Sequence, residues 1–300
     1  MNNKDYFKKL INKNKTNSQY DCIVMFSGGK DSTYLAHKLK NFGYNVLLFS
    51  IEHGFDYIHR TQETVKSLGL DHYIFRPKES NYLFNFIFTN IDELKNINFL
   101  SGKLISNPVC FFCTSFMNSI ATKFADEHNI PFVFRGTSPK QTKWKGNSLE
   151  SIHKFEDFRE SSKRYVYNQL KSLTNKNDTQ IKIIIDKICY IPKLTTSKII
   201  PFLYLDYNIN KIISTIKKEY NWKNPLSIRN NLYWSSGCKI VELIKFFGIE
   251  LEEYKEIELD YKQRKITKNV YNFDIRRRHI NKKEVSRLLK ELKLKNKDII

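Results

Sequence analysis

The feature that most constrains this chain is a run of four apolar residues, 23–26, that leads directly into Ser-Gly-Gly-Lys-Asp-Ser and then into a helical pattern. The first turn of a helix presents unpaired backbone N–H groups, and these donors bind anions together with the helix dipole. The two glycines let the backbone approach a ligand closely, and Lys30 adds a positive charge. The stretch therefore predicts an anion-binding loop between a buried strand and a helix.

Two other interpretations of this loop explain less of it. A plain glycine turn with an Asp or Ser cap does not account for a lysine and two hydroxyls around two glycines. The Walker nucleotide loop needs four residues between its glycines, whereas Gly28 and Gly29 are adjacent. A carboxylate would repel a phosphate unless it held a metal ion or capped the helix, so we expect Asp31 to help bind Mg²⁺.

Residues 27–32 resemble the PP-loop of the N-type ATP pyrophosphatases, and all six positions match. That superfamily includes tRNA sulfurtransferases, asparagine and GMP synthetases and N-acetyl sugar amidotransferases. The resemblance implies that the chain binds ATP with Mg²⁺ and cleaves it between the α and β phosphates. A substrate carbonyl oxygen would be adenylated, pyrophosphate would leave, and a nitrogen or sulfur nucleophile would then displace AMP.

Strand and helix patterns alternate along the first two thirds of the chain, which predicts an α/β fold with a parallel sheet. We expect a Rossmann-like, HUP-type sheet of about five strands with helices on both faces, plus a C-terminal helical region. The expected strands are 20–26, 44–54, 72–77, 130–136 and 197–206. The expected parts are a polar leader at 1–19, a nucleotide-binding domain at 20–215 with a helical excursion at 145–195, and a helical region at 216–300.

Ligands of such sheets bind at the carboxyl ends of the strands, so three segments should meet around ATP. They are the loop residues Ser27, Gly28, Gly29, Lys30, Asp31 and Ser32, the second-strand end Ser50, Ile51 and Glu52, and the fourth-strand end Arg135, Gly136 and Thr137. In the PP-loop families the second segment contacts adenine through its backbone. We expect Lys30, Asp31 and Arg135 to be catalytic, with Arg135 and Lys140 stabilising pyrophosphate as it leaves. The acceptor cleft should be lined by Arg135, Lys140 and Gln141.

Five cysteines form an odd, sparse set, which favours a reducing cytoplasm over disulfides. Cys110 and Cys113 form a CxxC motif just before a helix, which suits a zinc or iron–sulfur site, a redox pair, or two small core residues. Three-cysteine tRNA sulfurtransferases have a CxxC at this place and a third Cys further on, which together hold a [4Fe–4S] cluster. Cys110, Cys113 and Cys238 stand in that order, so the resemblance implies a Zn²⁺ or [4Fe–4S] site there. Cys22 and Cys189 are most simply core residues.

The C-terminal third resembles the end of the N-acetyl sugar amidotransferases. Segments 237–250 and 271–292 carry a Cys before a helix, a Phe-Gly stretch and an Ile-Arg…Ile segment, although the glycine of that pattern is absent. Members of that group often begin with a cysteine-rich segment, which this chain does not have before its loop. This second resemblance implies nitrogen transfer to a sugar-derived small molecule of surface polysaccharide (LPS) biosynthesis. The alternative is thiolation of tRNA or of a small molecule through Cys110, Cys113 and Cys238.

The two chemistries need different partners. Nitrogen transfer requires a separate glutaminase subunit, because no glutaminase domain is recognisable, and sulfur transfer requires a sulfur donor. The net charge of +20 is compatible with tRNA binding, although a solvated basic helix face explains the basic C-terminal region equally well. A nucleotide-binding protein without catalysis is a third class, which the intact loop disfavours. No apolar run is long enough to span a membrane, so we expect a cytoplasmic enzyme, with a homodimer compatible with the sequence.

Overall fold

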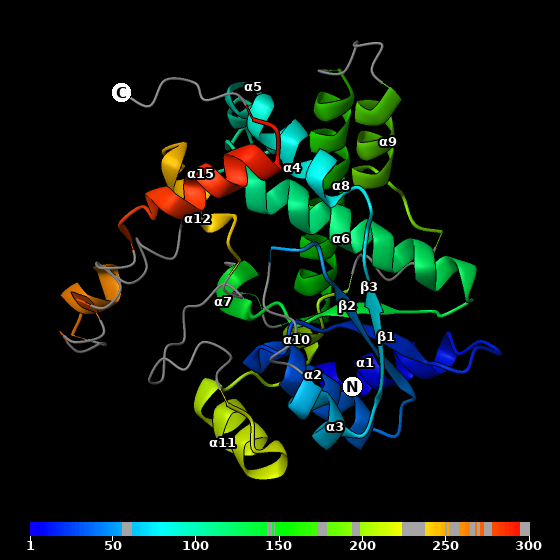
Figure 1. Cartoon of the computed structure of the whole chain (residues 1–300). Helices are drawn as coiled ribbons and strands as arrows, with labels where there is room; N and C mark the ends of the chain where they lie inside the picture. Colours follow the sequence, from blue (N-terminus) through cyan, green and yellow to red (C-terminus); the bar gives the residue numbers. More distant parts are fainter. Residues whose placement is uncertain are drawn as a thin grey trace.

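The computed structural model describes residues 1–55, 62–142, 144, 146, 148–172, 179–193, 199–223, 238–249, 251, 258–264, 268, 271–272 and 278–294. Within this part of the chain the sheet has four parallel strands in the order β3-β2-β1-β4 (Figure 1). The strands are β1 (Cys22–Met25), β2 (Val46–Ile51), β3 (Asp71–Phe75) and β4 (Val133–Arg135). Because β1 lies between β2 and β4, the loop that follows β1 opens at the middle of the sheet.

Helices cover both faces of the sheet, and the alternating side chains of β1 explain why. Cys22 and Val24 lie in one buried cluster with residues of α1 (Asn3–Lys13) and α2 (Lys30–Asn41). Ile23, which points to the opposite face, packs against Ala121 and Ala125 of α6 (Pro108–Glu127). A strand that is buried on both faces reads as a continuous apolar run, as this one does. The predicted α/β class with a parallel sheet and helices on both faces is confirmed.

The predicted fifth strand at 197–206 is wrong for its described part, where the short helix α10 (Pro201–Tyr204) forms instead. Pro201 occupies the start of this helix, where its fixed φ is favourable and its missing N–H costs nothing. Phe202 and Tyr204 are buried in the core beneath β1 and β4. The apolar run is therefore a buried helical turn, because a single turn can bury both aromatic rings without pairing with the sheet.

The predicted leader at 1–19 contains helix α1, which begins where Asn2 Oδ1 accepts a hydrogen bond from the Asp5 N–H. Phe7 and Ile11 on one face of α1 are fully buried. The Phe7 ring lies 5.5 Å from that of Phe134 on β4. The amphipathic pattern of the leader therefore belongs to the covering layer of the sheet.

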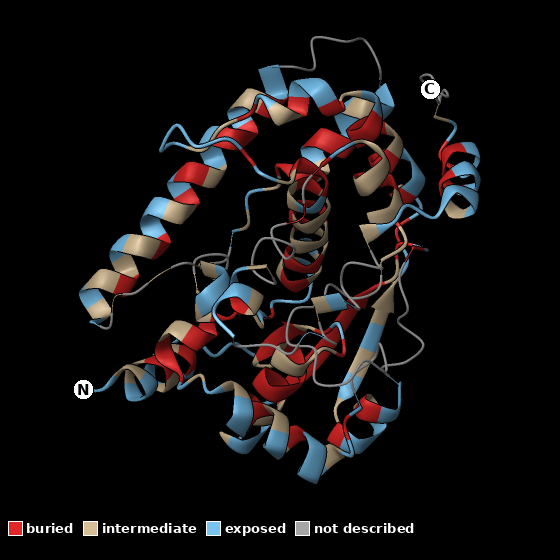
Figure 2. Cartoon of the chain, turned by 90° about the vertical axis from the view of Figure 1, so that its left-hand side faces the viewer, coloured by how far each residue is buried: buried red, intermediate tan, exposed pale blue. Residues whose placement is uncertain are grey.

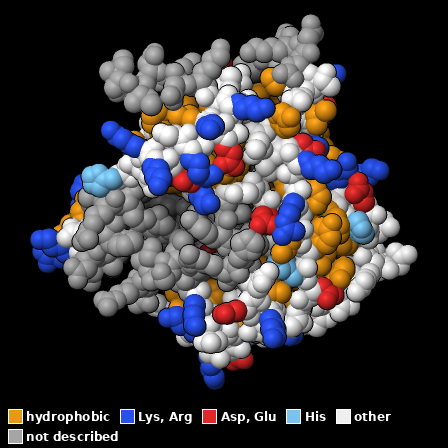
Figure 3. All heavy atoms as spheres, in the orientation of Figure 1, with side chains coloured by type: hydrophobic (Ala, Val, Ile, Leu, Met, Phe, Trp, Pro, Cys, Tyr) orange, Lys and Arg blue, Asp and Glu red, His pale blue; other side chains and the backbone are white. Residues whose placement is uncertain are grey.

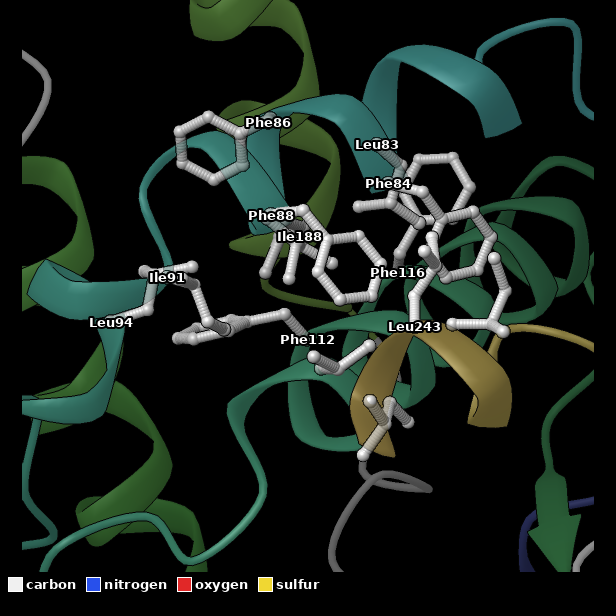
Figure 4. Packing of buried hydrophobic residues seen from close by; sticks show 14 of the residues in the cluster. Leu83, Phe84, Phe86, Phe88, Ile91, Leu94, Phe112, Phe116, Ile188 and Leu243 are labelled. Atoms are coloured by element: carbon white, nitrogen blue, oxygen red, sulfur yellow. The ribbon is translucent and has the colours of Figure 1, made fainter. Parts of the chain in front are cut away.

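A second, larger core lies in the helical part of the molecule, beyond the sheet. Figure 4 shows Phe84 and Phe88 of α4 (Ser80–Thr89), Phe112 and Phe116 of α6 and Leu243 of α12 (Val241–Phe246) around this core. The other helices that contribute to it are α5 (Ile91–Lys95), α8 (Leu149–Ser172), α9 (Thr179–Ile188) and α15 (Lys282–Glu291). The remaining described helices are α3 (Gln62–Leu68), α7 (Pro139–Thr142) and α11 (Ile209–Tyr220).

Helix α8 joins the two cores, and the predicted helical excursion at 145–195 consists of α8 and α9 in its described part. Ile152, near the start of α8, is buried with Phe134 in the core of the sheet. Val166 and Leu170, near its end, are buried in the helical core. Figure 2 shows buried residues on the strands and on the helix sides that face the interior. Among the described helices, none is both long and apolar enough to cross a membrane.

Candidate functional site

The loop after β1 is shaped by its own hydroxyls and glycines. Gly28 has a φ of 70°, which side chains other than glycine rarely adopt. Ser32 donates a hydrogen bond of 3.1 Å to the carbonyl of Gly29, and its Oγ lies 3.3 Å from Oγ of Ser27. The loop thus closes on itself and leads into the N-terminus of α2, which begins at Lys30. The N–H groups of that first turn and the Lys30 side chain thus lie at the place where the sequence predicts an anion site, and anion binding there stays a prediction.

Asp31 is held by two side chains. Lys30 Nζ lies 2.6 Å from Asp31 Oδ2, and the Tyr207 hydroxyl donates a hydrogen bond of 2.8 Å to Asp31 Oδ1. Burial and the Asp31 carboxylate raise the pKa of Tyr207 well above its ordinary value, so the hydroxyl keeps its proton at neutral pH. Tyr207 therefore fixes the direction of the carboxylate that we expect to help bind Mg²⁺. No motif or spacing in the sequence pointed to this residue.

A tryptophan from beyond α11 also contacts the loop. The indole N–H of Trp222 donates a hydrogen bond of 2.9 Å to the carbonyl of Gly28, and the ring is 7% exposed. Asn221, with a φ of 48°, ends α11 and turns the chain so that Trp222 can reach the loop. Helix α11 itself packs against α2. The loop is thus held both by helix α2, which follows it, and by Trp222. No sequence pattern pointed to a role for Trp222.

Gly136, directly after β4, is the third part of the predicted site that reaches the loop. A Cβ atom at this position would lie 2.7 Å from the backbone carbon of Asp31 and 2.7 Å from the backbone nitrogen of Ser32. Only glycine allows the chain to pass so close to the first turn of α2. The neighbouring Thr137 is half-buried. The end of β4 and the loop after β1 are therefore in direct contact, as the sequence predicts.

The residues at the end of β2 form most of their hydrogen bonds with the neighbouring strands of the sheet. Ser50 is buried, and its hydroxyl donates a hydrogen bond of 2.6 Å to the carbonyl of Phe26 and lies 2.7 Å from His72 Nε2. The backbone N–H of Glu52 donates to the carbonyl of Phe75, and the Glu52 carboxylate lies 2.5 Å from Arg76 Nε. Ile51 is buried. The adenine contacts that the sequence predicts for Ser50, Ile51 and Glu52 stay predictions.

Arg135 ends β4 and keeps solvent-accessible surface. The protein atoms around its guanidinium nevertheless lower its pKa to about 10, mainly through burial and then through the neighbouring charge of Arg159. Lys140, by contrast, lies 3.8 Å from Asp260, and the side-chain oxygen of Gln141 accepts a hydrogen bond of 2.8 Å from the Ser138 N–H.

The cysteines fall into two groups. Cys22 and Cys189 are buried in the two cores, as predicted, and burial raises the pKa of the Cys189 thiol to about 12. Cys110 is exposed, and Cys113 and Cys238 are half-buried. In the part of the chain that the structure describes, no three His, Cys, Asp or Glu side chains form a group that could hold a metal ion. The structure therefore gives no support to the Zn²⁺ or [4Fe–4S] site expected at the three cysteines.

Comparisons with known proteins place these features beside solved structures of low identity. No family model matches the chain, and no curated protein sequence matches it. Several solved structures are similar, and three of them are described here. A predicted subunit of a tRNA methyltransferase from Methanocaldococcus jannaschii has 19% identity and a TM-score of 0.34 over 66% of this chain and 75% of that chain. The NMN synthetase of Francisella tularensis has 14% identity and a TM-score of 0.33, and the match covers 77% of this chain and 98% of that chain. The NH3-dependent NAD synthetase of Campylobacter jejuni has 13% identity and a TM-score of 0.32, and the match covers 63% of this chain and 94% of that chain.

The class of the site follows from this chain's own geometry. A Ser-Gly-Gly-Lys-Asp-Ser loop lies at the carboxyl end of the central parallel strand, and Gly136 of the adjacent strand end packs against it. This is the PP-loop arrangement that the sequence predicts on an α/β sheet.

Proposed function

We propose that this chain is an ATP-dependent enzyme that adenylates a substrate, releases pyrophosphate and then transfers nitrogen to the activated carbon. The observation that carries the proposal is the complete PP-loop motif, folded at the carboxyl end of β1 with Lys30 and the first turn of α2 at its mouth. Ligands of open parallel sheets bind at this edge. The close contact of Gly136 with the loop leaves backbone, rather than side chains, at this point of the site.

Each residue of the loop has a chemical task in this proposal. The N–H groups of α2 and the Lys30 ammonium would bind phosphate oxygens of ATP. Asp31, oriented by Tyr207, would hold Mg²⁺, which supplies positive charge to the phosphates when it is bound. Arg135 stays protonated at neutral pH, since its pKa of about 10 lies well above 7, and would stabilise the charge on departing pyrophosphate.

Nitrogen transfer is favoured by the C-terminal part of the chain. The segment that resembles the sugar amidotransferases docks beside the end of β2, where the Lys239 N–H donates a hydrogen bond of 2.7 Å to the Phe55 carbonyl. Helices α12 and α15 of this part are joined by a hydrogen bond from the Asn281 N–H to Glu242. We therefore propose an amidotransferase-like reaction on a sugar-derived small molecule of surface polysaccharide biosynthesis, with ammonia from a separate glutaminase subunit. Residues 275–277 of the resemblance lie outside the described residues.

Sulfur transfer is the second candidate, and one observation favours it. Cys113 lies in the CxxC motif of α6, and its thiolate would raise the pKa of Arg135 at the end of β4. A thiolate or persulfide on Cys113 would thus stand beside the end of β4. This reaction would need an external sulfur donor and a tRNA or small-molecule acceptor.

A tRNA acceptor would need a basic surface, and one is present on α15. Figure 3 shows Lys and Arg side chains gathered over this part of the molecule. Lys282, Lys283 and Lys290 are exposed, whereas Arg287 pairs with Glu284 and Glu291 of the same helix. Binding of bulk tRNA that weakens steeply with salt would support the RNA acceptor, and no binding at low salt would exclude it.

The experiment that tests the proposed function measures pyrophosphate release from ATP, with ammonium or sulfide as the nucleophile, and with nucleotide sugars or bulk tRNA as acceptors. Lys30→Ala should abolish release while the protein stays folded by circular dichroism. Lys66→Ala, which removes an exposed lysine of α3, is the matched control and should release pyrophosphate like the wild type. Normal release by Lys30→Ala would contradict the adenylation proposal. Faster release with ammonium than with sulfide would select nitrogen transfer.

A further inference from the structure

A chain of two hydrogen bonds runs from β3 to the entrance of the PP-loop. The Ser50 hydroxyl donates a hydrogen bond of 2.6 Å to the carbonyl of Phe26, directly before the loop, and its Oγ lies 2.7 Å from His72 Nε2. A hydroxyl has one proton, and Ser50 uses it on Phe26, so His72 must donate the second bond through its Nε2–H. The chain thus crosses the neighbouring strands β3, β2 and β1 (Figure 1).

Packing holds the members of this chain in place. Ser50 is 2% exposed and His72 is half-buried. The His72 ring meets the Phe26 ring edge-on, with the two centroids 5.9 Å apart. Leu48, the strand partner of His72, is buried with Phe26 in the core that α2 covers, so the chain lies on the α2 face of the sheet. Burial also lowers the pKa of His72, so the ring is neutral at pH 7 and keeps its one proton on Nε2.

The peptide group between Phe26 and Ser27 is held at both of its ends. Its carbonyl accepts the hydrogen bond from Ser50, and its N–H, that of Ser27, donates to Ser32 Oγ at 3.4 Å. Because a peptide group is planar, it cannot turn without weakening one of these two bonds. Through this peptide the chain passes from β1 into the loop. The hydroxyls of Ser50 and Ser32 therefore set the direction in which the loop leaves the strand.

Two carbonyls inside the loop are held in the same way. The Gly28 carbonyl accepts the 2.9 Å hydrogen bond from Trp222, and the Gly29 carbonyl accepts the 3.1 Å hydrogen bond from Ser32. With Phe26, three successive turns of the backbone therefore point a carbonyl at a donor of the protein. A carbonyl oxygen that faces a phosphate repels it, whereas backbone N–H groups attract it. Bonds that hold the carbonyls thus favour an anion at the loop.

We propose that His72 is a positioning residue of the PP-loop, which acts through Ser50 to hold the Phe26 carbonyl away from the phosphates of ATP. The inference rests on the proposed adenylating function. His72 itself does not touch the nucleotide, and the Ser50 side chain serves the loop instead of adenine. Without the Nε2–H donor the buried Ser50 oxygen would lack a partner, and its hydroxyl would be free to turn away from Phe26.

The test compares a ligand that carries phosphates with one that does not. Equilibrium dialysis measures the affinity for Mg²⁺ with α,β-methylene-ATP, and competition against it measures the affinity for adenosine. Ser50→Ala and His72→Leu should each weaken binding of the ATP analogue about threefold to tenfold, the effect of one hydrogen bond, and leave adenosine binding unchanged. His72→Gln, whose amide N–H can replace Nε2–H, should bind the analogue nearly like the wild type. His72→Asn, whose amide is one carbon shorter, should not.

Two matched controls remove the same groups elsewhere. Ser67→Ala removes an exposed hydroxyl that donates a hydrogen bond of 3.0 Å to the Glu63 carbonyl within α3, and His128→Leu removes an exposed histidine at the end of α6. Both should bind both ligands like the wild type.

Three results would count against these assignments. Unchanged affinity for the ATP analogue in Ser50→Ala and His72→Leu would overturn the proposal, as would an equal loss of adenosine binding, which would assign Ser50 to adenine. A loss in His72→Gln as large as in His72→Leu would overturn the role of the Nε2–H donor. If Ser50→Ala fails to fold, the three His72 variants decide. No binding of the analogue by the wild type would instead overturn the proposed function, and the inference with it.

Discussion

The hydroxyl of Tyr207 donates a hydrogen bond of 2.8 Å to Oδ1 of Asp31, and so joins the segment before α11 to the PP-loop. The two residues are 176 positions apart in the chain. Together with the hydrogen bond from Trp222 to the Gly28 carbonyl, this bond joins the region around α11 to the proposed nucleotide site. The Asp31 side chain is held on one oxygen by Lys30 and on the other by Tyr207.

Tyr207→Phe should release Asp31 without unfolding the chain. A hydrogen bond to a charged group contributes about 1.5–3 kcal/mol, so we expect pyrophosphate release to fall about tenfold or more and the Mg²⁺ concentration for half-maximal rate to rise. Tyr220→Phe is the control, since its hydroxyl lies 2.7 Å from His37 Nδ1 at the far end of α11. Equal Mg²⁺ dependence in the two variants would contradict a positioning role for Tyr207.

Gly136→Ala should disturb the loop directly. The added Cβ would meet backbone atoms of Asp31 and Ser32 at 2.7 Å, and backbone cannot move aside as a flexible side chain does. We expect a loss of about 1–3 kcal/mol in the free energy of unfolding, measured with urea, and a marked loss of ATP binding. Gly29→Ala, where the new Cβ would meet only the Ser27 hydroxyl at 3.3 Å, should destabilise the fold less. If Gly29→Ala lowered the free energy of unfolding more than Gly136→Ala, the close contact between the end of β4 and the loop would be contradicted.

Trp222→Phe keeps an aromatic ring but removes the donor to Gly28. We expect the carbonyl of Gly28 to lose its partner at a cost of about 1–3 kcal/mol, and ATP to bind more weakly because the loop is less fixed. Trp222 should also report nucleotide binding through its fluorescence. Trp144→Phe, which keeps the stacking on Phe155, should retain the fluorescence change on nucleotide binding. If Trp144→Phe lost this fluorescence change, the signal would not come from Trp222.

Glu156 should make the stability of the chain depend on pH. Burial raises its pKa from 4.5 to about 7, and the side chain is 4% exposed. A carboxyl group that is more basic in the folded state favours folding when it is protonated. Its contribution is therefore present below pH 4.5, decreases between about 4.5 and 7, and is lost above 7. The total change is on the order of 3 kcal/mol, since one pKa unit corresponds to about 1.4 kcal/mol.

Urea titrations at several pH values would measure this dependence. Glu156→Gln should remove it, because a neutral amide keeps an oxygen for the Ile200 N–H and a donor for the Tyr204 oxygen. Glu150→Gln, on the exposed side of α8, should leave the slope between pH 5 and 7 unchanged. An equal slope in the wild type and Glu156→Gln would show that Glu156 is ionised in the folded protein throughout this range.

The central strand, the loop and the helix after it could be predicted from the amino-acid sequence alone. This was possible because hydrophobic burial on both faces of β1 and the chemistry of the loop act within about ten consecutive residues. The sequence also determined the parallel order of strand and helix, and through Gly136 the second strand end at the site. These features depend on local periodicity and on residue types that have few other uses.

The distant side chains that complete the site could not be predicted in this way, because they reach it through the packing of helices far apart in the chain. Tyr207 and Trp222 reach the loop because α11 packs against α2. The run 197–206 resembled a strand, but burial of its aromatic rings in a helical turn prevailed over local preference. Tertiary packing sets these contacts, since a tyrosine or an arginine has the same local pattern whether it faces solvent or a ligand.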